Sequence, residues 1–284
     1  MSALLVVSAA SLGCSTTPIW PFSALTPNAP HEAPPAVDQA PISSKTASPS
    51  SGPHIVQLAF DVMRVEMPID GDMNSQKVWN HVDALRVGAD TAAQLTRNGL
   101  HIAAGSKERW SAIRAILDAG QARTTRDQFV AQSGAPLLIE LGTVADGESY
   151  FAYDKEMRLQ GKTFIGGSKI LQLDYAFRPE LGGSTDLQVA FEIRRELGEL
   201  VWERQGDGSI RQAPGLDRHV FEELKAALTV QDGEFLIIGP SAQAKNEYRV
   251  GGRFFLTGTG GHRKETLLFI TPRPFQVEGS KKPV

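Results

Sequence analysis

The residues of this chain that could do chemistry are a glycine-rich loop, the histidines and a single thiol. The loop, Gly258 to Lys264, reads GTGGHRK. A phosphate-binding loop ends in Gly-Lys-Ser/Thr and leads into a helix whose N-terminus binds the anion. Here that ending is missing and a strand pattern follows, so the loop predicts a hairpin turn.

The rest of the sequence contains no motif typical of metal binding or of nucleophilic catalysis. The six histidines show no metal-binding spacing and no His-Glu-x-x-His motif. A single cysteine excludes an internal disulfide and a thiolate zinc site, and no Gly-x-Ser-x-Gly elbow occurs. The charged run Glu192 to Glu196 is interpreted as a solvated strand end. We therefore expect no enzyme activity, no cofactor, no metal ion and no evident small-molecule substrate.

The overall charge of the chain bears on which classes of partner it could bind. The 284 residues include 29 basic and 32 acidic side chains, a formal net charge of −3. This balance gives no electrostatic reason to expect nucleic acid as a partner. No apolar run is long enough to predict a membrane-spanning helix.

The one thiol, Cys14, follows a short apolar segment, and small residues such as Ser11 and Gly13 precede it. This pattern resembles a bacterial lipoprotein signal peptide, after which the cysteine is lipid-modified. The resemblance implies that residues 1–13 are removed and that Cys14 anchors the chain in the outer membrane, facing the periplasm. No basic residue precedes Cys14, which leaves open whether Met1 is the true start. The alternative is an apolar N-terminus with an incidental cysteine.

The segment 14–53 is rich in proline, serine and alanine and carries few charges. Such a segment buries too little apolar surface to offset its ordering entropy, so it predicts a disordered tether. Charged residues become frequent from His54 onward, and we expect folding to begin there. Residues 277–284 are expected to be a disordered tail.

Residues 54–120 predict a small α/β module. Alternating apolar residues from Ile55 to Met67 indicate a strand. Helical spacing follows near Val78 to Leu85, again over residues 90–97, and after Ser106 up to Gly120.

Residues 121–276 show a different sequence pattern from residues 54–120. Short strand patterns, such as Leu171 to Phe177 and Leu187 to Ile193, alternate with glycine-containing turns. This pattern is typical of antiparallel sheets. The segment Val220 to Leu228 fits a helix by propensity and a strand by alternation, and we expect a strand in its second half. The predicted fold class is α+β, with the α/β module followed by a mainly antiparallel β-rich domain.

The C-terminal segment resembles the closing part of the secretin domain of type II and type III secretion channels and pilus secretins. The resemblance extends over residues 128–275, and its most specific part is the final strand with its Thr-Pro-Arg ending. Its structural motif residues are Val230, Asp232, Gly233, Glu265, Leu267, Leu268, Phe269, Thr271, Pro272 and Arg273. Independently of the resemblance, the continuous apolar run Leu267 to Ile270 predicts a strand buried on both faces. Pro272, which lacks an N–H, is predicted to end its pairing.

The resemblance implies a secretin-like, lipid-anchored component of a protein secretion channel or associated cell-envelope assembly. Its partners would be the membrane, through Cys14, and either further copies of itself or secretion-system proteins. The alternative is a monomeric periplasmic binding or scaffold lipoprotein with a degenerate secretin-like sheet and no pore. Pro240 stands where the family usually has glycine, a departure that argues against pore formation, and the shortened pattern and the absence of an Ile-Pro element favour that alternative.

Overall fold

The computed structural model describes residues 54–69, 75–131, 135–204, 208–258 and 263–278. The predicted signal peptide, the tether and Cys14 lie outside these residues. The chain from Ser51 onward forms one compact unit of mostly antiparallel sheet with some helices. The final strand continues to Glu278, two residues into the segment predicted to be a disordered tail.

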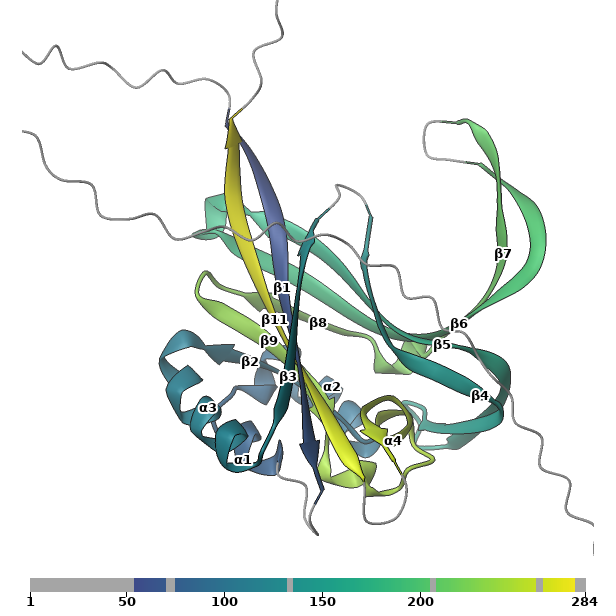
Figure 1. Ribbon diagram of the computed structural model, residues 1–284, viewed down its shortest axis with the longest axis horizontal. Coiled ribbons are helices and arrows are strands. Elements are labelled where there is room, and N and C mark those ends of the chain that lie inside the picture. Colours follow the sequence, from purple (N-terminus) through teal and green to yellow (C-terminus); the bar gives the residue numbers. More distant parts are fainter. Residues whose placement is uncertain (1–53, 70–74, 132–134, 205–207, 259–262, 279–284) are drawn as a thin grey trace, which may run out of the picture. The chain divides into compact units, whose positions relative to one another are not determined.

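The first of two sheets has the strand order β2-β9-β11-β1-β3, and the short β10 also pairs with β11 (Figure 1). Its strands are β1 (His54–Pro68), β2 (Leu100–Ser106), β3 (Arg123–Val130), β9 (Glu234–Pro240), β10 (Leu256–Thr257) and β11 (Lys264–Glu278).

The centre of this sheet joins the two ends of the folded chain. β1 pairs antiparallel with β11 along its whole length, from His54 opposite Glu278 to Pro68 opposite Lys264. β1 belongs to the segment predicted to form a separate α/β module, whereas β11 belongs to the predicted β-rich domain. The predicted boundary between residues 120 and 121 is therefore not a boundary of the sheet.

The second sheet follows the chain as successive antiparallel hairpins, in the order β4-β5-β6-β7, and β8 pairs with β6. The ambiguous segment becomes a 3-10 turn at Glu222–Leu224 followed by strand β8, which confirms the expected strand in its second half. This sheet does not close on itself. Its strands are β4 (Leu137–Tyr153), β5 (Leu159–Arg178), β6 (Ser184–Arg204), β7 (Ile210–Val220) and β8 (Ala226–Val230).

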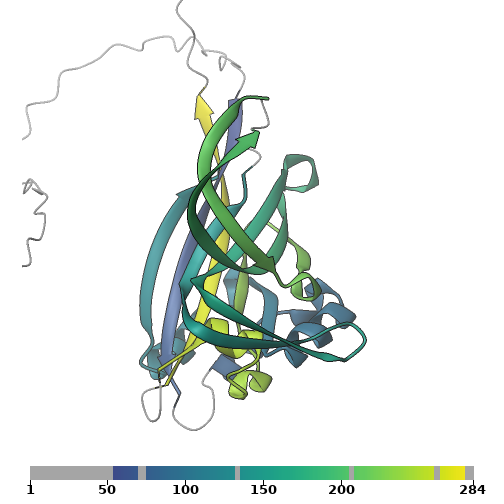
Figure 2. The same cartoon turned by 90° about the vertical axis from the view of Figure 1, so that its right-hand side faces the viewer.

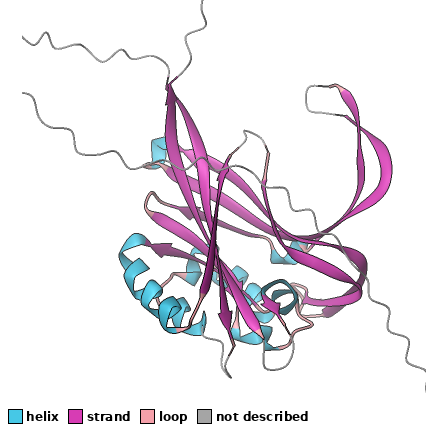
Figure 3. Cartoon of the chain, viewed as in Figure 1, coloured by secondary structure: helices cyan, strands magenta, loops and turns pink. Residues whose placement is uncertain are grey.

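The helices are short and lie toward one end of the strands (Figure 3). They are α1 (Ser75–Trp79), α2 (Ala89–Arg97), α3 (Trp110–Ala119) and α4 (Val250–Phe255). The expected helix near Val78 to Leu85 is only the short α1, followed by a 3-10 turn. Within the described part of the chain, no helix combines the length and apolarity that crossing a membrane requires.

Strand β11 lies between two hydrophobic clusters. Leu267 and Phe269 pack with apolar residues of α1 and α3, including Val78 and Ile113. Leu268 and Ile270, which point to the opposite face, pack in the larger cluster shared with the second sheet, α2 and α4. All four side chains are buried, so the predicted burial of this strand on both faces is confirmed.

Pairing does not stop at Pro272, and that prediction was wrong. Pro272 lies opposite Phe60, and Pro274 lies opposite Leu58. β9 pairs with β11 only as far as Ile270. In an antiparallel pair, alternate residues direct their N–H away from the neighbouring strand. At both prolines the backbone nitrogen points away from β1, toward the side on which β9 pairs with β11. The pairing with β9 does not extend to these residues, so the missing N–H groups cost no hydrogen bond between strands.

Candidate assembly surface

The Asp-Gly part of the predicted motif is a tight turn between β8 and β9. Val230 ends β8 fully buried, and Gly233 has a left-handed φ of 78° that favours glycine. The carbonyl of Gly233 accepts a hydrogen bond from the Lys107 N–H at 3.1 Å, just before α3. The turn therefore fixes the position of α3 on the first sheet.

Glu265 of the motif is also structural. Its carboxylate is fully buried and accepts hydrogen bonds from the backbone N–H and the hydroxyl of Ser75, at 2.7 and 2.6 Å. Ser75 is the first residue of α1, whose free N–H groups favour a carboxylate partner. Glu265 thus attaches α1 to β11, and Leu267, Leu268 and Phe269 beside it are core residues.

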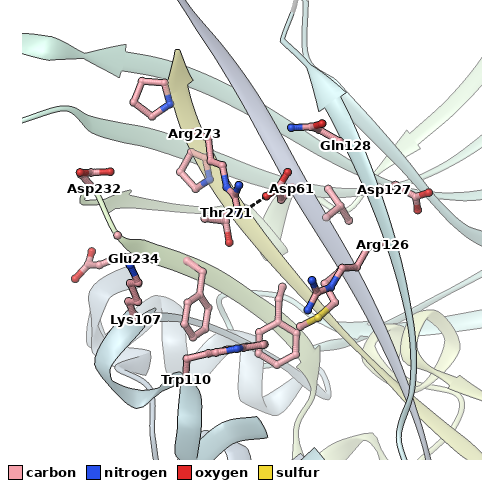
Figure 4. A pocket seen from close by; sticks show the side chains of 17 residues that line it. Asp61, Lys107, Trp110, Arg126, Asp127, Gln128, Asp232, Glu234, Thr271 and Arg273 are labelled. Carbon is pink, nitrogen blue, oxygen red and sulfur yellow. Dashed lines mark ion pairs between the residues drawn. The ribbon is translucent and has the colours of Figure 1, made fainter. Parts of the chain in front are cut away.

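The remaining motif residues line an open groove beside α3 (Figure 4). The groove has a volume of about 900 Å³, and Trp110 packs edge-on against Phe235 and Phe269 in it. Arg273 forms an ion pair with Asp61 at 2.6 Å. Within the described residues no cluster of side chains able to hold a metal ion occurs. The groove gathers these motif residues: Asp232, Gly233, Phe269, Thr271, Pro272 and Arg273.

The charged run at Glu192 differs from the prediction of a solvated strand end. Glu192 is fully buried and accepts hydrogen bonds from the Nη2 and Nε of Arg218, at 2.7 and 3.1 Å. Arg194 forms an ion pair with its other carboxylate oxygen. Arg218 also donates to the Gln172 side chain at 3.0 Å. These contacts connect β5, β6 and β7, and sequence reasoning missed them because the partners are distant along the chain.

A second charged cluster lies between β4, β5 and α4. The Lys169 ammonium donates to the Arg253 carbonyl at 2.8 Å and lies 3.4 Å from the Glu148 carboxylate. Burial lowers the pKa of Lys169, although Glu148 opposes this effect, and burial raises the pKa of the enclosed Tyr150. The side chains come from three elements that meet here, so the cluster joins α4 to the second sheet.

His219 of β7 is a titratable group in the second sheet, near the start of its projecting part. The pKa of His219 is lowered by burial and by Lys162, whose ammonium lies 3.1 Å from the imidazole Nδ1. The ring also packs against Phe164 and Phe221. His219 is therefore a histidine held in place by packing and by its contact with Lys162.

The hairpin formed by the outer halves of β6 and β7 projects from the second sheet (Figures 1 and 2). β5 pairs with β6 only up to Arg194, opposite Ser168. The pairing of β6 with β7 continues beyond it to Arg204, after a register shift between Glu196 and Leu200. Gly198, inside this shift, has a left-handed φ of 74°. Bulges of this kind bend a strand, which is how the hairpin turns away from the sheet.

One face of this hairpin exposes large apolar side chains. Leu200 and Trp202 of β6 and Ile210 of β7 are 62%, 70% and 60% exposed. Leu200 lies opposite Pro214 and Arg204 lies opposite Ile210, so the three side chains share a face. Sequence reasoning ended the strand at Ile193 and missed this surface, although the alternation of Leu200 and Trp202 after Gly198 was the available signal.

No protein family matches this sequence, and no curated protein matches it. Among solved structures, similarity is found to the InvG secretin domain β-barrel of the Salmonella SPI-1 injectisome, with a TM-score of 0.23 and 11% identity over 81% of this chain. Similarity is also found to a near-atomic cryo-EM structure of the same Salmonella type III secretion injectisome secretin, with a TM-score of 0.22 and 10% identity over 81% of this chain. The chain spans 64% and 66% of those chains, which is less than two thirds of their length.

Proposed function

We propose that this protein is a structural component of a cell-envelope assembly that joins further copies of itself through the second sheet. The assembly is a secretin-like secretion channel or a complex associated with one. In this proposal the protein is not an enzyme. Cys14 carries a lipid that holds it at the outer membrane on the periplasmic side, and the motif residues of β8, of the turn after it and of β11 build the scaffold.

The observation that carries this proposal is the projecting hairpin of β6 and β7. A two-stranded hairpin is at best marginally stable alone in water, and this one exposes Leu200, Trp202 and Ile210 on one face. Exposed apolar surface of this kind marks a site that another surface covers. The unclosed second sheet supports the same interpretation, because β7 is an outer strand along whose far edge no other described strand pairs, and such an edge offers a template for a further strand.

Replacing Trp202 by aspartate is expected to lower the fraction of assembled protein at least about tenfold, since removing a central interface aromatic costs about 2 kcal/mol or more. The measurement is the size of the detergent-extracted full chain, where the wild type is expected to form a large heat-resistant complex. Arg211→Asp, on the opposite face of the same hairpin, is the matched control and is expected to assemble normally.

A wild-type protein that is monomeric in detergent would overturn this proposal. It would favour the second candidate, a monomeric scaffold or binding lipoprotein. Assembly of Trp202→Asp to the same extent as Arg211→Asp would show instead that the hairpin is not the contact.

Replacing Cys14 by serine is expected to move the protein from the membrane fraction to the soluble fraction. The physical reason is the loss of the acyl chains, which supply about 0.8 kcal/mol for each buried methylene group. Fractionation of cells that express either form, with detection of the full chain, measures this. If the serine variant stays in the membrane as tightly as the wild type, the lipid anchor at Cys14 is ruled out.

A further inference from the structure

Strand β3 is an exposed edge of the first sheet. It pairs with β1 over Ala59 to Glu66, and no other described strand pairs with it. Nearly every residue from Arg123 to Val130 is exposed. The opposite edge strand, β2, differs, because Asp83 exchanges backbone hydrogen bonds with Ala104 of β2 at 2.8 and 3.1 Å. Of these two edges, β3 is the more accessible.

The direction of the free backbone groups on β3 follows from one hydrogen bond. The N–H of Ala131, the residue after β3, donates to the carbonyl of Leu58 in β1, at 2.7 Å. Because these directions alternate along an antiparallel strand, Thr124, Arg126 and Gln128 direct their N–H and carbonyl groups outward. A row of outward donors and acceptors is a template for a further strand.

We propose that this edge pairs antiparallel with β3 of a second copy of this chain, with Thr125 opposite Thr125 of the partner subunit. Outward-directed residues must face outward-directed residues in such a pair. A symmetric pair centred on one of the four middle residues of β3 therefore places Thr125, Arg126, Asp127 or Gln128 opposite its own copy.

Charge selects among these registers. Centring on Arg126 or Asp127 places like charges directly opposite each other, which is unfavourable. Centring on Gln128 places Asp127 opposite an aromatic ring, Phe129 of the partner subunit. Centring on Thr125 places Arg123 opposite Asp127 of the partner subunit, twice by symmetry, and pairs two threonines. Of the four registers, only the one centred on Thr125 places oppositely charged residues opposite each other.

A pocket on the α3 side of the first sheet can receive a side chain of the partner strand. A pocket of about 420 Å³ separates α3 from β3 and is lined by Asp118, Thr124 and Arg126, among others. The proposed register places Arg126 of the partner subunit opposite Thr124, on this face. Asp118, whose nearest basic group is Arg114 at 3.8 Å, is available there as a second partner. The contact is isologous, as a two-fold axis requires, and it goes beyond the proposed function because it uses the first sheet.

Disulfide cross-linking of variants with a single cysteine in β3 would determine the register of the pair. Cys14 is the only native cysteine, so each variant is made in the full chain carrying Cys14→Ser. Thr125→Cys is expected to give a disulfide-linked dimer on mild oxidation, because facing residues of this type have Cα atoms about 4.5 Å apart, within the disulfide range. Thr124→Cys is the matched control and is expected to give no dimer band that is lost on reduction. A dimer obtained with Arg126→Cys, Asp127→Cys or Gln128→Cys instead would overturn the register, and no dimer from any variant would overturn the pairing.

Charge exchange tests the same pairing without a cross-link. Asp127→Arg places an arginine opposite Arg123 of the partner subunit, and Arg123→Asp places two carboxylates together. Each is expected to lower the dimer fraction in sedimentation velocity of protein that also carries Trp202→Asp, which removes the second-sheet contact, and combining Asp127→Arg with Arg123→Asp is expected to restore it. Both side chains are exposed, so circular dichroism should show a retained fold. Single variants that dimerise like the wild type would contradict the proposal.

Discussion

Replacing Gly251 by alanine is expected to destabilise the protein by about 3 kcal/mol, because overpacking against rigid backbone is among the most costly changes in a core. A Cβ at this position would lie 1.9 Å from the carbonyl oxygen of Gly99 and 2.2 Å from its carbonyl carbon. The Gly251 N–H also donates to the Asn98 carbonyl at 2.9 Å. The start of α4 therefore lies directly on the end of α2, and neither backbone segment can move without breaking this contact.

Urea unfolding of the full chain measures this effect. The matched control is Gly215→Ala, whose Cβ would meet its nearest atoms at 3.4 Å, an ordinary contact distance. We expect the control to lie within about 0.5 kcal/mol of the wild type. Equal midpoints for the two variants would show that α4 and α2 do not approach as closely as described.

Replacing Phe191 by alanine is expected to cost about 3–5 kcal/mol, the range for a fully buried phenylalanine. Phe191 of β6 is fully buried and packs edge-on against Phe254 and Phe255 of α4, at centroid distances of 5.5 and 6.2 Å. The same cluster includes Phe60 of β1. The loss should therefore lower the stability of both sheets together and shift a single unfolding transition.

Thermal unfolding followed by tryptophan fluorescence and by far-ultraviolet circular dichroism tests this expectation. Of the four tryptophans, Trp79 and Trp110 lie in the helices packed on the first sheet, whereas Trp202 is 70% exposed already in the folded state, so the change in fluorescence on unfolding reports mainly on the first sheet. Circular dichroism reports on both sheets. Phe275→Ala removes a phenylalanine that is 37% exposed near the end of β11 and is expected to cost far less. Separate transitions for the two signals in Phe191→Ala would mean that the sheets have separate cores.

The elements that sequence reasoning identified are those with a strong local pattern. Leu267 to Ile270 are continuously apolar, and both faces of that strand are buried as predicted. The alternation from Leu187 to Ile193 is strand β6, and the helix over residues 90–97 is α2. In each case the periodicity of apolar side chains matches the period of the element.

The features that sequence reasoning missed depend on residues far apart in the chain. Glu192 is buried with its carboxylate bound by Arg218 of the next strand, and Arg218 is held in turn by Gln172 of the previous strand. Pro272 is tolerated because β9 ends before it, which the sequence around Pro272 does not encode. The joining of the predicted α/β module to the β-rich segment depends on pairing between β1 and β11. Local propensity contains no information about such partners.

The pairing of β1 with β11 has a consequence for how the chain is made. The first strand of the folded unit has the last strand as its central neighbour, so the first sheet cannot form until β11 has been synthesised. Contacts of such high sequence separation form slowly, because the loop between them must be closed first. While the ribosome is still translating, the nascent polypeptide lacks the strand that completes its sheet.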